Sequence, residues 1–419
     1  MATFTPIDTS APARGMLAGF VVSDLTVAAL IVLAAIGAAA DRTLPAVLCA
    51  LVLILSLLAR LWARAALEGV HYHCEASCAR AFQGDELVLT LTLENRKRLP
   101  VPWLLISEQV PSGLELLDGE PVAAGVLGST WLVATTALAP RERVRLSYRL
   151  RAVRRGHYRF GPARLSGGDP FGFYESQRML LQMRATLVVY PRFAPRVPAV
   201  RALARPIGDV AARPRGIDDP TLPVSVREYR RGDPARAIDW KATARRGAPW
   251  VRLNDASVSG AVVLVVECET RTHSIWDDSP RLLESVLSTA ATLARDLLAA
   301  GHAVGMVANG VPPGDHARVA IAPGAGPGQL PLLLDALARV QPLVLKPLAV
   351  LLDAHAGRVL SFGASVVCVA GVLPAATAAM LVTRARRGTR TVLVDVGEVD
   401  AAAVPGVRVL RLPPAQEAA

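Results

Sequence analysis

Lysine is almost absent from this chain, and aromatic residues are scarce. Of 46 Lys and Arg residues in 419, three are lysine, so nearly all of the basic charge is arginine. The formal net charge of +11 invites a nucleic-acid interpretation. The aromatic residues, 5% of the chain, do not interleave with arginine as base-stacking platforms do. Because net charge alone indicates only non-specific attraction, we expect no nucleic-acid partner.

Cysteine is also rare, and the five cysteines form no disulfide framework. Cys74 and Cys78 lie in a segment with an extended pattern, where four residues span roughly 13 Å, too far for a bridge. The other three lie in apolar runs. No Cys/His spacing typical of a zinc site is present. We therefore expect reduced, structural thiols, which fits a cytoplasmic soluble region.

Motifs of catalytic and nucleotide-binding sites are missing as well. The Gly-rich stretch 324–328 lacks the Gly-Lys-Ser/Thr ending of a phosphate loop. No Gly-x-Ser-x-Gly elbow is present, and the seven histidines are scattered along the chain. The sequence thus predicts a non-enzymatic protein without a cofactor, and it leaves any small-molecule ligand undetermined. A hydrolase of unknown class remains a second alternative, because a triad assembled in space leaves no sequence signature.

Long apolar runs are what the chain has in excess. Hydrophobic residues make up 52% of it, and its mean hydropathy is +0.36. Residues 17–40 and 44–59 are almost wholly apolar, and three polar residues separate them. Each run, with its flanks, approaches the ~20 residues that cross a bilayer. We predict a two-helix transmembrane hairpin anchor over residues 1–66, with Asp24 at the start of the first span, where a carboxylate is tolerable.

Charges flanking the two runs predict their orientation. Arg14 precedes them, Arg60 and Arg64 end them, and the pair Asp41-Arg42 between them is neutral. The positive-inside rule then places both ends in the cytoplasm, as in a multi-pass protein of the cytoplasmic (inner) membrane. Two alternatives stay open. One is a signal peptide cleaved after residues 38–40, and the other is a hairpin buried in a soluble protein, which the uniformly apolar faces argue against.

Residues 67–198 carry a strand pattern. Residues 86–94 and 143–151 alternate between apolar and polar side chains, which is typical of half-buried antiparallel strands. Turn-forming clusters at 111–113 and 167–170 separate the runs at a spacing usual in sandwiches. This region is predicted to be a β-sandwich, a fold that serves mostly as spacer or docking surface.

Residues 261–419 alternate between strand and helix. Residues 261–267 form a continuous apolar run, typical of a central parallel strand, and a helical pattern runs from Pro280 to Gly301. Further strands are predicted at 303–307, 365–370, 391–396 and 407–410, with helices at 330–340, 348–355 and 375–386. This order predicts a C-terminal doubly wound α/β domain. The fold class as a whole is therefore a membrane-anchored α+β protein.

Between these domains, residues 199–260 hold a linker and an arginine-rich motif. Three carboxylates lie among eight basic residues between positions 227 and 252. Asp233 is expected to cap a short helix whose first residue is a proline. Two interpretations fit equally. The motif is a charged docking surface for an acidic partner, with Trp240 as an aromatic anchor, or it is an internal network of Arg–carboxylate pairs.

The motif resembles the signature of the domain of unknown function 58 family (DUF58), bacterial proteins often encoded beside MoxR-type AAA ATPases. The family pattern reads approximately R-E-Y-x-x-G-D-x-x-R-x-I-D-W-x-x-x-A-R. The matching residues are Arg227, Glu228, Tyr229, Gly232, Asp233, Arg236, Ile238, Asp239, Trp240, Ala244 and Arg245. The stretches 154–158, 169–172 and 189–192 also look like this family, so the resemblance extends over nearly the whole chain.

The resemblance implies function as well as architecture. It implies a von Willebrand factor A-like C-terminal domain and a non-enzymatic interaction or scaffold protein. That protein would work with a MoxR-type AAA ATPase in the assembly or maturation of another complex. Within the motif, we hypothesise that Asp239 and Trp240 mainly hold the short helix. Arg230 and Arg231, which precede a turn, would project toward the partner.

Domains of the von Willebrand factor A type often bind Mg²⁺ through Asp-x-Ser-x-Ser after the first strand. In this sequence the corresponding loop, residues 267–272, lacks both serines, and Arg271 places a positive charge where a cation would sit. We predict no metal site, although Glu267, Glu269 and Thr270 are the residues that would supply oxygen ligands. A metal-dependent binding domain of this type remains the first alternative function.

Overall fold

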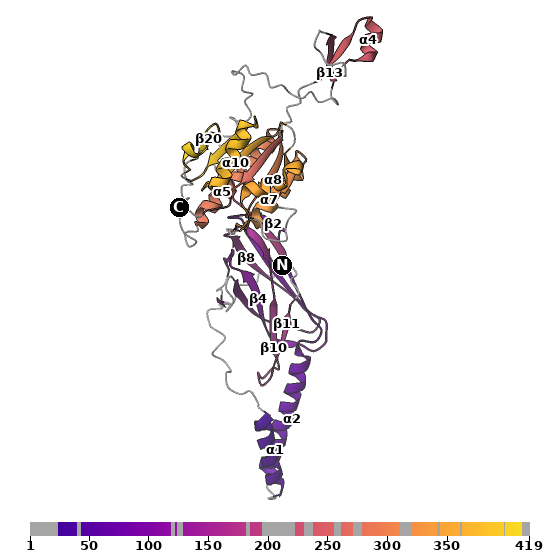
Figure 1. Cartoon of the computed structure of the whole chain (residues 1–419). Helices are drawn as coiled ribbons and strands as arrows, with labels where there is room; N and C mark the ends of the chain where they lie inside the picture. Colours follow the sequence, from indigo (N-terminus) through magenta and orange to yellow (C-terminus); the bar gives the residue numbers. More distant parts are fainter. Residues whose placement is uncertain are drawn as a thin grey trace. The chain divides into compact units, whose positions relative to one another are not determined.

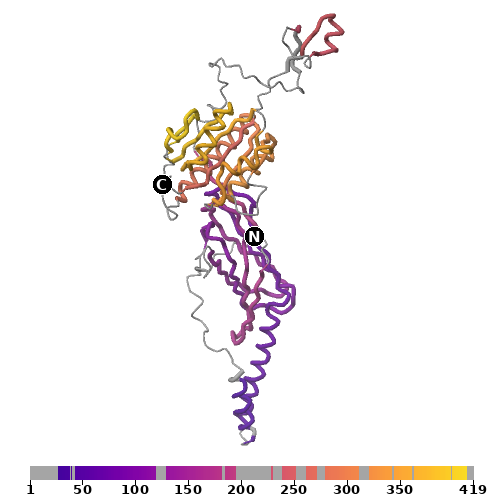
Figure 2. Tube along the Cα trace, viewed as in Figure 1, coloured from indigo at the N-terminus to yellow at the C-terminus, as the bar shows by residue number. Residues whose placement is uncertain are grey.

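The computed structural model describes most of the chain in two compact units, Met1–Tyr190 and Pro191–Ala419 (Figure 1, Figure 2). The described residues are 24–39, 43–118, 122–123, 129–181, 185–194, 223–229, 238–254, 261–270, 279–310, 320–341, 344–360, 363–397 and 399–412.

The first unit begins with two apolar helices, α1 (Asp24–Ala39) and α2 (Thr43–Ala66), which contact each other. With 24 residues, α2 is the one helix among the described residues that is long and apolar enough to cross a membrane. The 16 residues of α1 rise only ~24 Å, less than the ~30 Å of a hydrocarbon core. One possible span is therefore found where two were predicted.

After α2 come two antiparallel sheets. The first has the strand order β1 (Val70–Ala76), β3 (Glu86–Asn95), β8 (Arg143–Ala152), β5 (Leu114–Leu116). The second has the order β11 (Glu175–Leu180), β10 (Ala163–Gly168), β4 (Val101–Pro111), β7 (Ser129–Leu138), β6 (Val122–Ala123). A small sheet of β2 (Arg80–Phe82), β12 (Thr186–Tyr190) and β9 (Gly156–Arg159) accompanies them.

One apolar core joins these sheets into a sandwich. Its residues come from strands of all three sheets, among them Leu89 of β3, Ile106 of β4 and Leu187 of β12, all fully buried. The period-two pattern of residues 86–94 is the cause, because it turns every second side chain of β3 inward. The predicted strands at 86–94 and 143–151 are both present and pair with each other.

Lys97 connects the sandwich to α2. Its ammonium group donates hydrogen bonds to the carbonyl oxygens of Ala65, Ala66 and Glu68, at 2.5 Å for Ala65 and 2.9 Å for Glu68. The last carbonyls of a helix have no intrahelical partner and carry partial negative charge, so a cation is favoured there. Burial lowers the pKa of Lys97. The end of α2 is thus fixed by a residue of the sandwich.

The second unit contains a six-stranded sheet. Its order is β17 (Ala320–Gly324), β16 (Ala303–Ala308), β15 (Ala261–Val266), β18 (Ser365–Ala370), β19 (Thr391–Asp395), β20 (Arg408–Arg411). All pairs are parallel except that of β17 with β16. The antiparallel edge strand β17 was not predicted. The chain order reverses at β15, the position at which ligands usually bind in open α/β sheets.

Helices connect the strands of this sheet. Helices α5 (Pro280–Ala299) and α7 (Gln329–Arg339) contact each other, and α8 (Leu348–Ala354) contacts both α9 (Ala356–Val359) and α10 (Ala375–Arg386). A short 3-10 helix, η2 (Ala401–Ala403), precedes β20. Every side chain of β15 is buried, as its unbroken apolar sequence predicts. The strand and helix pattern predicted for residues 261–419 is confirmed in these elements.

Candidate functional site

The arginine-rich motif folds as two strands and a short helix. Strand β13 (Pro223–Glu228) pairs antiparallel with β14 (Trp250–Asn254), and α4 (Trp240–Arg246) lies between them in the chain (Figure 1). Residues 230–237 lie outside the described residues, so Arg230, Arg231, Gly232, Asp233 and Arg236 are not placed. The predicted cap by Asp233 falls in the same gap.

Asp239 is the cap of the helix that is described. Its carboxylate accepts hydrogen bonds of 3.0 Å from the backbone N–H groups of both Lys241 and Ala242. An Asp at this position satisfies donors that the first helical turn leaves unpaired. At the other end Gly247 has φ 69°, a left-handed conformation that favours glycine. The sequence therefore sets both ends of α4, and the hypothesis that Asp239 holds this helix is consistent with the geometry.

Trp240 does not hold the helix by burial, because 69% of its surface is exposed. This exposure does not fit a Trp240 ring packed inside the motif, and the role in holding the helix stays a hypothesis. Another tryptophan makes a contact with the helix: the guanidinium carbon of Arg246 lies 4.0 Å from the ring centroid of the half-buried Trp250. Cation–π attraction and the pairing of β13 with β14 stabilise the motif without the Trp240 ring.

Basic side chains are exposed on the same short helix as Trp240. Lys241, Arg245 and Arg246 are all exposed, and α4 contains no acidic residue. Tyr229, at the end of β13, is 39% exposed. Glu228 is exposed too, and it has interaction partners of its own. We call the exposed side chains of Trp240, Lys241 and Arg245 the α4 surface.

A second cluster lies at the carboxyl end of the central strand of the second unit. Glu267 directly follows β15 and is 1% exposed. Its carboxylate accepts hydrogen bonds from the amide of Asn309, from the hydroxyl of Thr377 at 2.7 Å, and from the N–H of Glu269 at 3.2 Å. Burial raises the pKa of Glu267, and these hydrogen bonds oppose that shift. Neutral donors directly after β16 and within α10 therefore satisfy this buried acid.

The residues named as possible oxygen ligands differ in their exposure to solvent. Thr270 is buried at 3% exposure, whereas Glu269 is only half-buried. In the part of the chain that the structure describes, no three His, Cys, Asp or Glu side chains group as metal ligands would. Asn309 and Thr377 were missed as members of the cluster. Asn309 directly follows β16, so its place at a strand end was the available signal.

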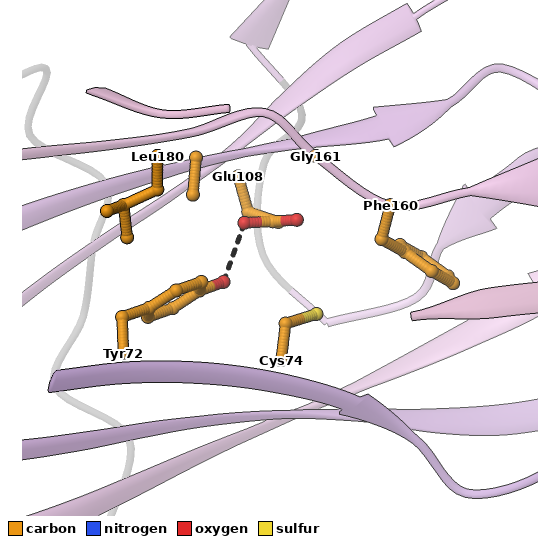
Figure 3. Close-up of a pocket in the computed structure, with 7 residues that line it drawn as sticks. Tyr72, Cys74, Glu108, Phe160, Gly161 and Leu180 are labelled. Carbon is orange, nitrogen blue, oxygen red and sulfur yellow. Dashed lines mark hydrogen bonds between the residues drawn. The ribbon is translucent and has the colours of Figure 1, made fainter. Parts of the chain in front are cut away.

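The sandwich holds a third cluster, around a small cavity (Figure 3). The hydroxyl of Tyr72 donates a 2.6 Å hydrogen bond to Glu108, which is 1% exposed. Burial raises the pKa of Glu108 to about 7 and that of Cys74 to about 12. The cavity has a volume of about 10 Å³, room for no more than about one water molecule. It is too small for a substrate, and no sequence signal marked Glu108 in advance.

Known proteins resemble parts of this chain. Residues 225–418 match a family described as "Protein of unknown function DUF58". This range runs from β13 to the last described strand, so the DUF58 resemblance predicted from the motif is confirmed there. The stretches 154–158, 169–172 and 189–192 lie before the matched range.

A curated relative of the DUF58-matching chain is "Uncharacterized protein YeaD" of Bacillus subtilis (strain 168). It is 27% identical over 227 residues, which cover 54% of this chain and 52% of that protein. The chain thus spans about half the length of this relative. Its description names no activity.

Solved structures with similarity to the chain are distant. The CARDB domain of the PF1109 protein from Pyrococcus furiosus is 12% identical, covers 29% of this chain and 90% of its own, and has a TM-score of 0.19. A non-cellulosomal cohesin from Archaeoglobus fulgidus is 13% identical, with coverage of 32% and 99% and a TM-score of 0.20. Scores this low carry no argument about fold or function.

Proposed function

We propose that this chain is a non-enzymatic, membrane-tethered interaction protein that binds an acidic partner through the α4 surface. The observation that carries the proposal is the 69% exposure of Trp240 beside the exposed Lys241 and Arg245. A large aromatic ring that the protein's own core does not use is typical of the anchor of an interface. The tether is α2, which is long and apolar enough to cross a membrane.

The partner favoured by the family resemblance is a MoxR-type AAA ATPase, acting in the assembly or maturation of another complex. The two cations of the α4 surface, Lys241 and Arg245, select an acidic partner surface, because charge complementarity steers association and excludes like-charged partners. The second unit, with its chain reversal at β15 and antiparallel edge strand β17, would be a von Willebrand factor A-like domain. It would present the α4 surface or a client, without chemistry of its own.

The metal-dependent alternative has less support. A Mg²⁺ site needs oxygen atoms free to coordinate, whereas both carboxylate oxygens of Glu267 accept hydrogen bonds from neutral donors. Calorimetric titration of the protein with Mg²⁺ and Mn²⁺ separates the two functions. We expect no stoichiometric binding at submillimolar concentration. Such a signal, if Glu267→Ala or Glu269→Ala abolished it, would favour the metal-dependent function.

We also propose that the soluble region faces the cytoplasm, with α1 and α2 forming a multi-pass anchor in the inner membrane. The reason is that Arg60 and Arg64 lie in the last turns of α2, and basic residues stay on the cytoplasmic side. A reporter fused after residue 419 tests this. Activity of a cytoplasmic reporter is expected, and activity of alkaline phosphatase in its place would reject the orientation.

The docking experiment uses the full chain in nanodiscs and a purified MoxR-type ATPase of the source organism. Trp240→Ala is expected to weaken binding by about 2 kcal/mol, the scale of an interface hot spot. Lys241→Glu/Arg245→Glu should slow association, and added salt should reduce the difference from wild type.

A matched control for the charge reversal is Arg386→Glu/Arg387→Glu. These two exposed arginines also end a helix, α10, and a left-handed glycine, Gly388, follows them as Gly247 follows α4. The change in net charge is the same, so non-specific electrostatics would weaken binding equally in both variants. Equal loss in the control, or full binding by Trp240→Ala, would remove the support for the α4 surface.

A further inference from the structure

The turn between β10 and β11 lies against the side of α2 (Figure 1, Figure 2). The hydroxyls of Tyr174 and Ser56 are 2.7 Å apart, and the Ser176 hydroxyl donates a 2.7 Å hydrogen bond to the carbonyl oxygen of Ala63. The helix face that is buried there consists of small residues, which permit close approach: Ser56, Ala59, Ala63 and Ala66. The first unit therefore covers the last three turns of α2 with a β-turn.

The length of α2 fixes how deep this turn would lie in a membrane. Its 24 residues rise ~36 Å, and a hydrocarbon core is ~30 Å thick, so only ~6 Å of the helix can project beyond it. Ser56 is ten residues before Ala66, or ~15 Å along the axis. A helix α2 that spans the core therefore places Ser56, and the Tyr174 hydroxyl beside it, ~9 Å below the surface of the hydrocarbon.

The side chains of the turn suit that depth. Phe171 is 50% exposed, and its ring stacks on Phe173 with the centroids 5.7 Å apart. No Lys, Arg or Glu occurs from residue 169 to residue 174, and the single acid, Asp169, is fully buried. Exposed phenylalanines cost free energy in water and gain it at the boundary between headgroups and acyl chains.

The backbone of the turn is also adapted to an apolar environment. The Asp169 carboxylate accepts hydrogen bonds from the N–H groups of Phe171 at 2.9 Å and Tyr174 at 2.6 Å, and its carbonyl oxygen accepts from the N–H of Gly172 at 3.3 Å and the indole of Trp103 at 3.1 Å. Irregular backbone is tolerated at membrane depth only when its polar groups are satisfied by protein. Gly168 allows this closure, because a Cβ there would lie 2.2 Å from the Tyr174 carbonyl oxygen.

We propose that residues 169–174 form a second membrane contact, in which Phe171 and Phe173 insert into a phospholipid bilayer beside α2. The inference rests on the proposed membrane tether, because it takes its depth from α2. The turn then fixes the depth and the tilt of the sandwich, so the sandwich does not swing freely at the end of α2. We infer that the turn contacts a lipid bilayer and not a protein partner, because it adjoins a helix whose other faces expose Leu57, Leu58 and Leu61.

Fluorescence quenching in proteoliposomes tests the depth. The full chain carries Cys78→Ala and one new cysteine labelled with an environment-sensitive dye, at Phe171, at Gln177 of β11, or at Glu115 of β5. Position 177 neighbours Ser176, which is at the level of Ala63, and position 115 pairs with Arg151 at the end of the sandwich away from α2. The Cys78→Ala chain without a new cysteine measures labelling of the buried thiols.

Phospholipids brominated in their acyl chains are expected to quench the dye strongly at position 171, weakly at 177 and not at 115. Aqueous iodide should quench in the opposite order. Iodide quenching at 171 as strong as at 115, in protein that resists extraction by alkaline carbonate, would overturn this inference and leave the tether standing. Shielding of 171 from both quenchers would mean that a protein covers the turn, which also overturns it. Extraction by carbonate would reject the tether, and the inference with it.

Discussion

Tyr72 and Glu108 join the two large sheets of the sandwich across their shared core: the phenol on β1 donates a hydrogen bond to the carboxyl group on β4 (Figure 3). Burial of the carboxyl is the main cause that raises its pKa to about 7. Burial of the phenol likewise raises the pKa of Tyr72, so the phenol stays protonated and remains a hydrogen-bond donor. The bond therefore couples the proton on Glu108 to the packing of the sheets.

This coupling predicts a pH dependence of stability. Between the ordinary pKa of Glu, about 4.3, and about 7, the folded chain holds a proton on Glu108 that the unfolded chain releases. The contribution of Glu108 to stability is therefore greatest at low pH and is lost as pH rises through about 7, a decrease on the order of 3 kcal/mol. Glu108→Gln should lose this component, as measured by denaturant melts at pH 5 and pH 8. The exposed Glu115→Gln is the control, and a Glu108→Gln chain with an unchanged pH profile would contradict the prediction.

Removal of the Lys97 ammonium should loosen the junction between α2 and the sandwich. Lys97→Met keeps the aliphatic stem and leaves the carbonyls of Ala65 and Ala66 without this donor. The expected cost is about 1–2 kcal/mol. Hydrogen exchange of residues 66–70 should become faster. The exposed Lys346→Met should leave exchange unchanged, and equal protection in both variants would show that the cap is unimportant.

Asp239 and Trp240 are adjacent in sequence but are predicted to differ in role. Asp239→Ala removes the acceptor for two helix N–H groups and should destabilise α4 by about 1 kcal/mol. Trp240→Ala removes an exposed ring and should change stability by less than ~0.5 kcal/mol, while it weakens partner binding. Two measurements on both variants separate the roles: the protection of α4 in hydrogen exchange, and the affinity for the partner. A large loss of stability in Trp240→Ala would return the motif to an internal network.

Thr377 supports the buried Glu267, and its hydroxyl can be removed with little change in shape. Thr377→Val leaves one carboxylate oxygen without its donor, which should cost about 1–3 kcal/mol at neutral pH. Thr383→Val on the same helix is a matched control, because its exposed hydroxyl bonds only to the carbonyl oxygen of Ala379 in the preceding turn. Denaturant melts compare the free energies of unfolding of the two variants. Equal stability of the two variants would mean that Glu267 finds another donor.

Local periodicity was enough to predict much of this architecture. The apolar run at residues 44–59 predicted a long helix, and the strict alternation at 86–94 predicted strand β3. The repeated strand–helix order after residue 261 predicted most of the second sheet. These features depend on neighbours within one or two turns, so the sequence displays them directly. The family motif was visible for the same reason, since its residues lie within one short stretch.

Tertiary structure alone decided which distant residues meet. Ser56 and Tyr174 are 118 positions apart, and Glu267 and Thr377 are 110 apart. Nothing in their local sequence marks either pair, because sheet pairing and helix packing select such contacts only when the whole core forms. The antiparallel edge strand β17 was missed for this reason, and so was the exposure of Trp240, which a local apolar pattern placed inside. Periodicity predicts which face of an element is apolar, whereas the packing of the other elements determines whether that face is covered.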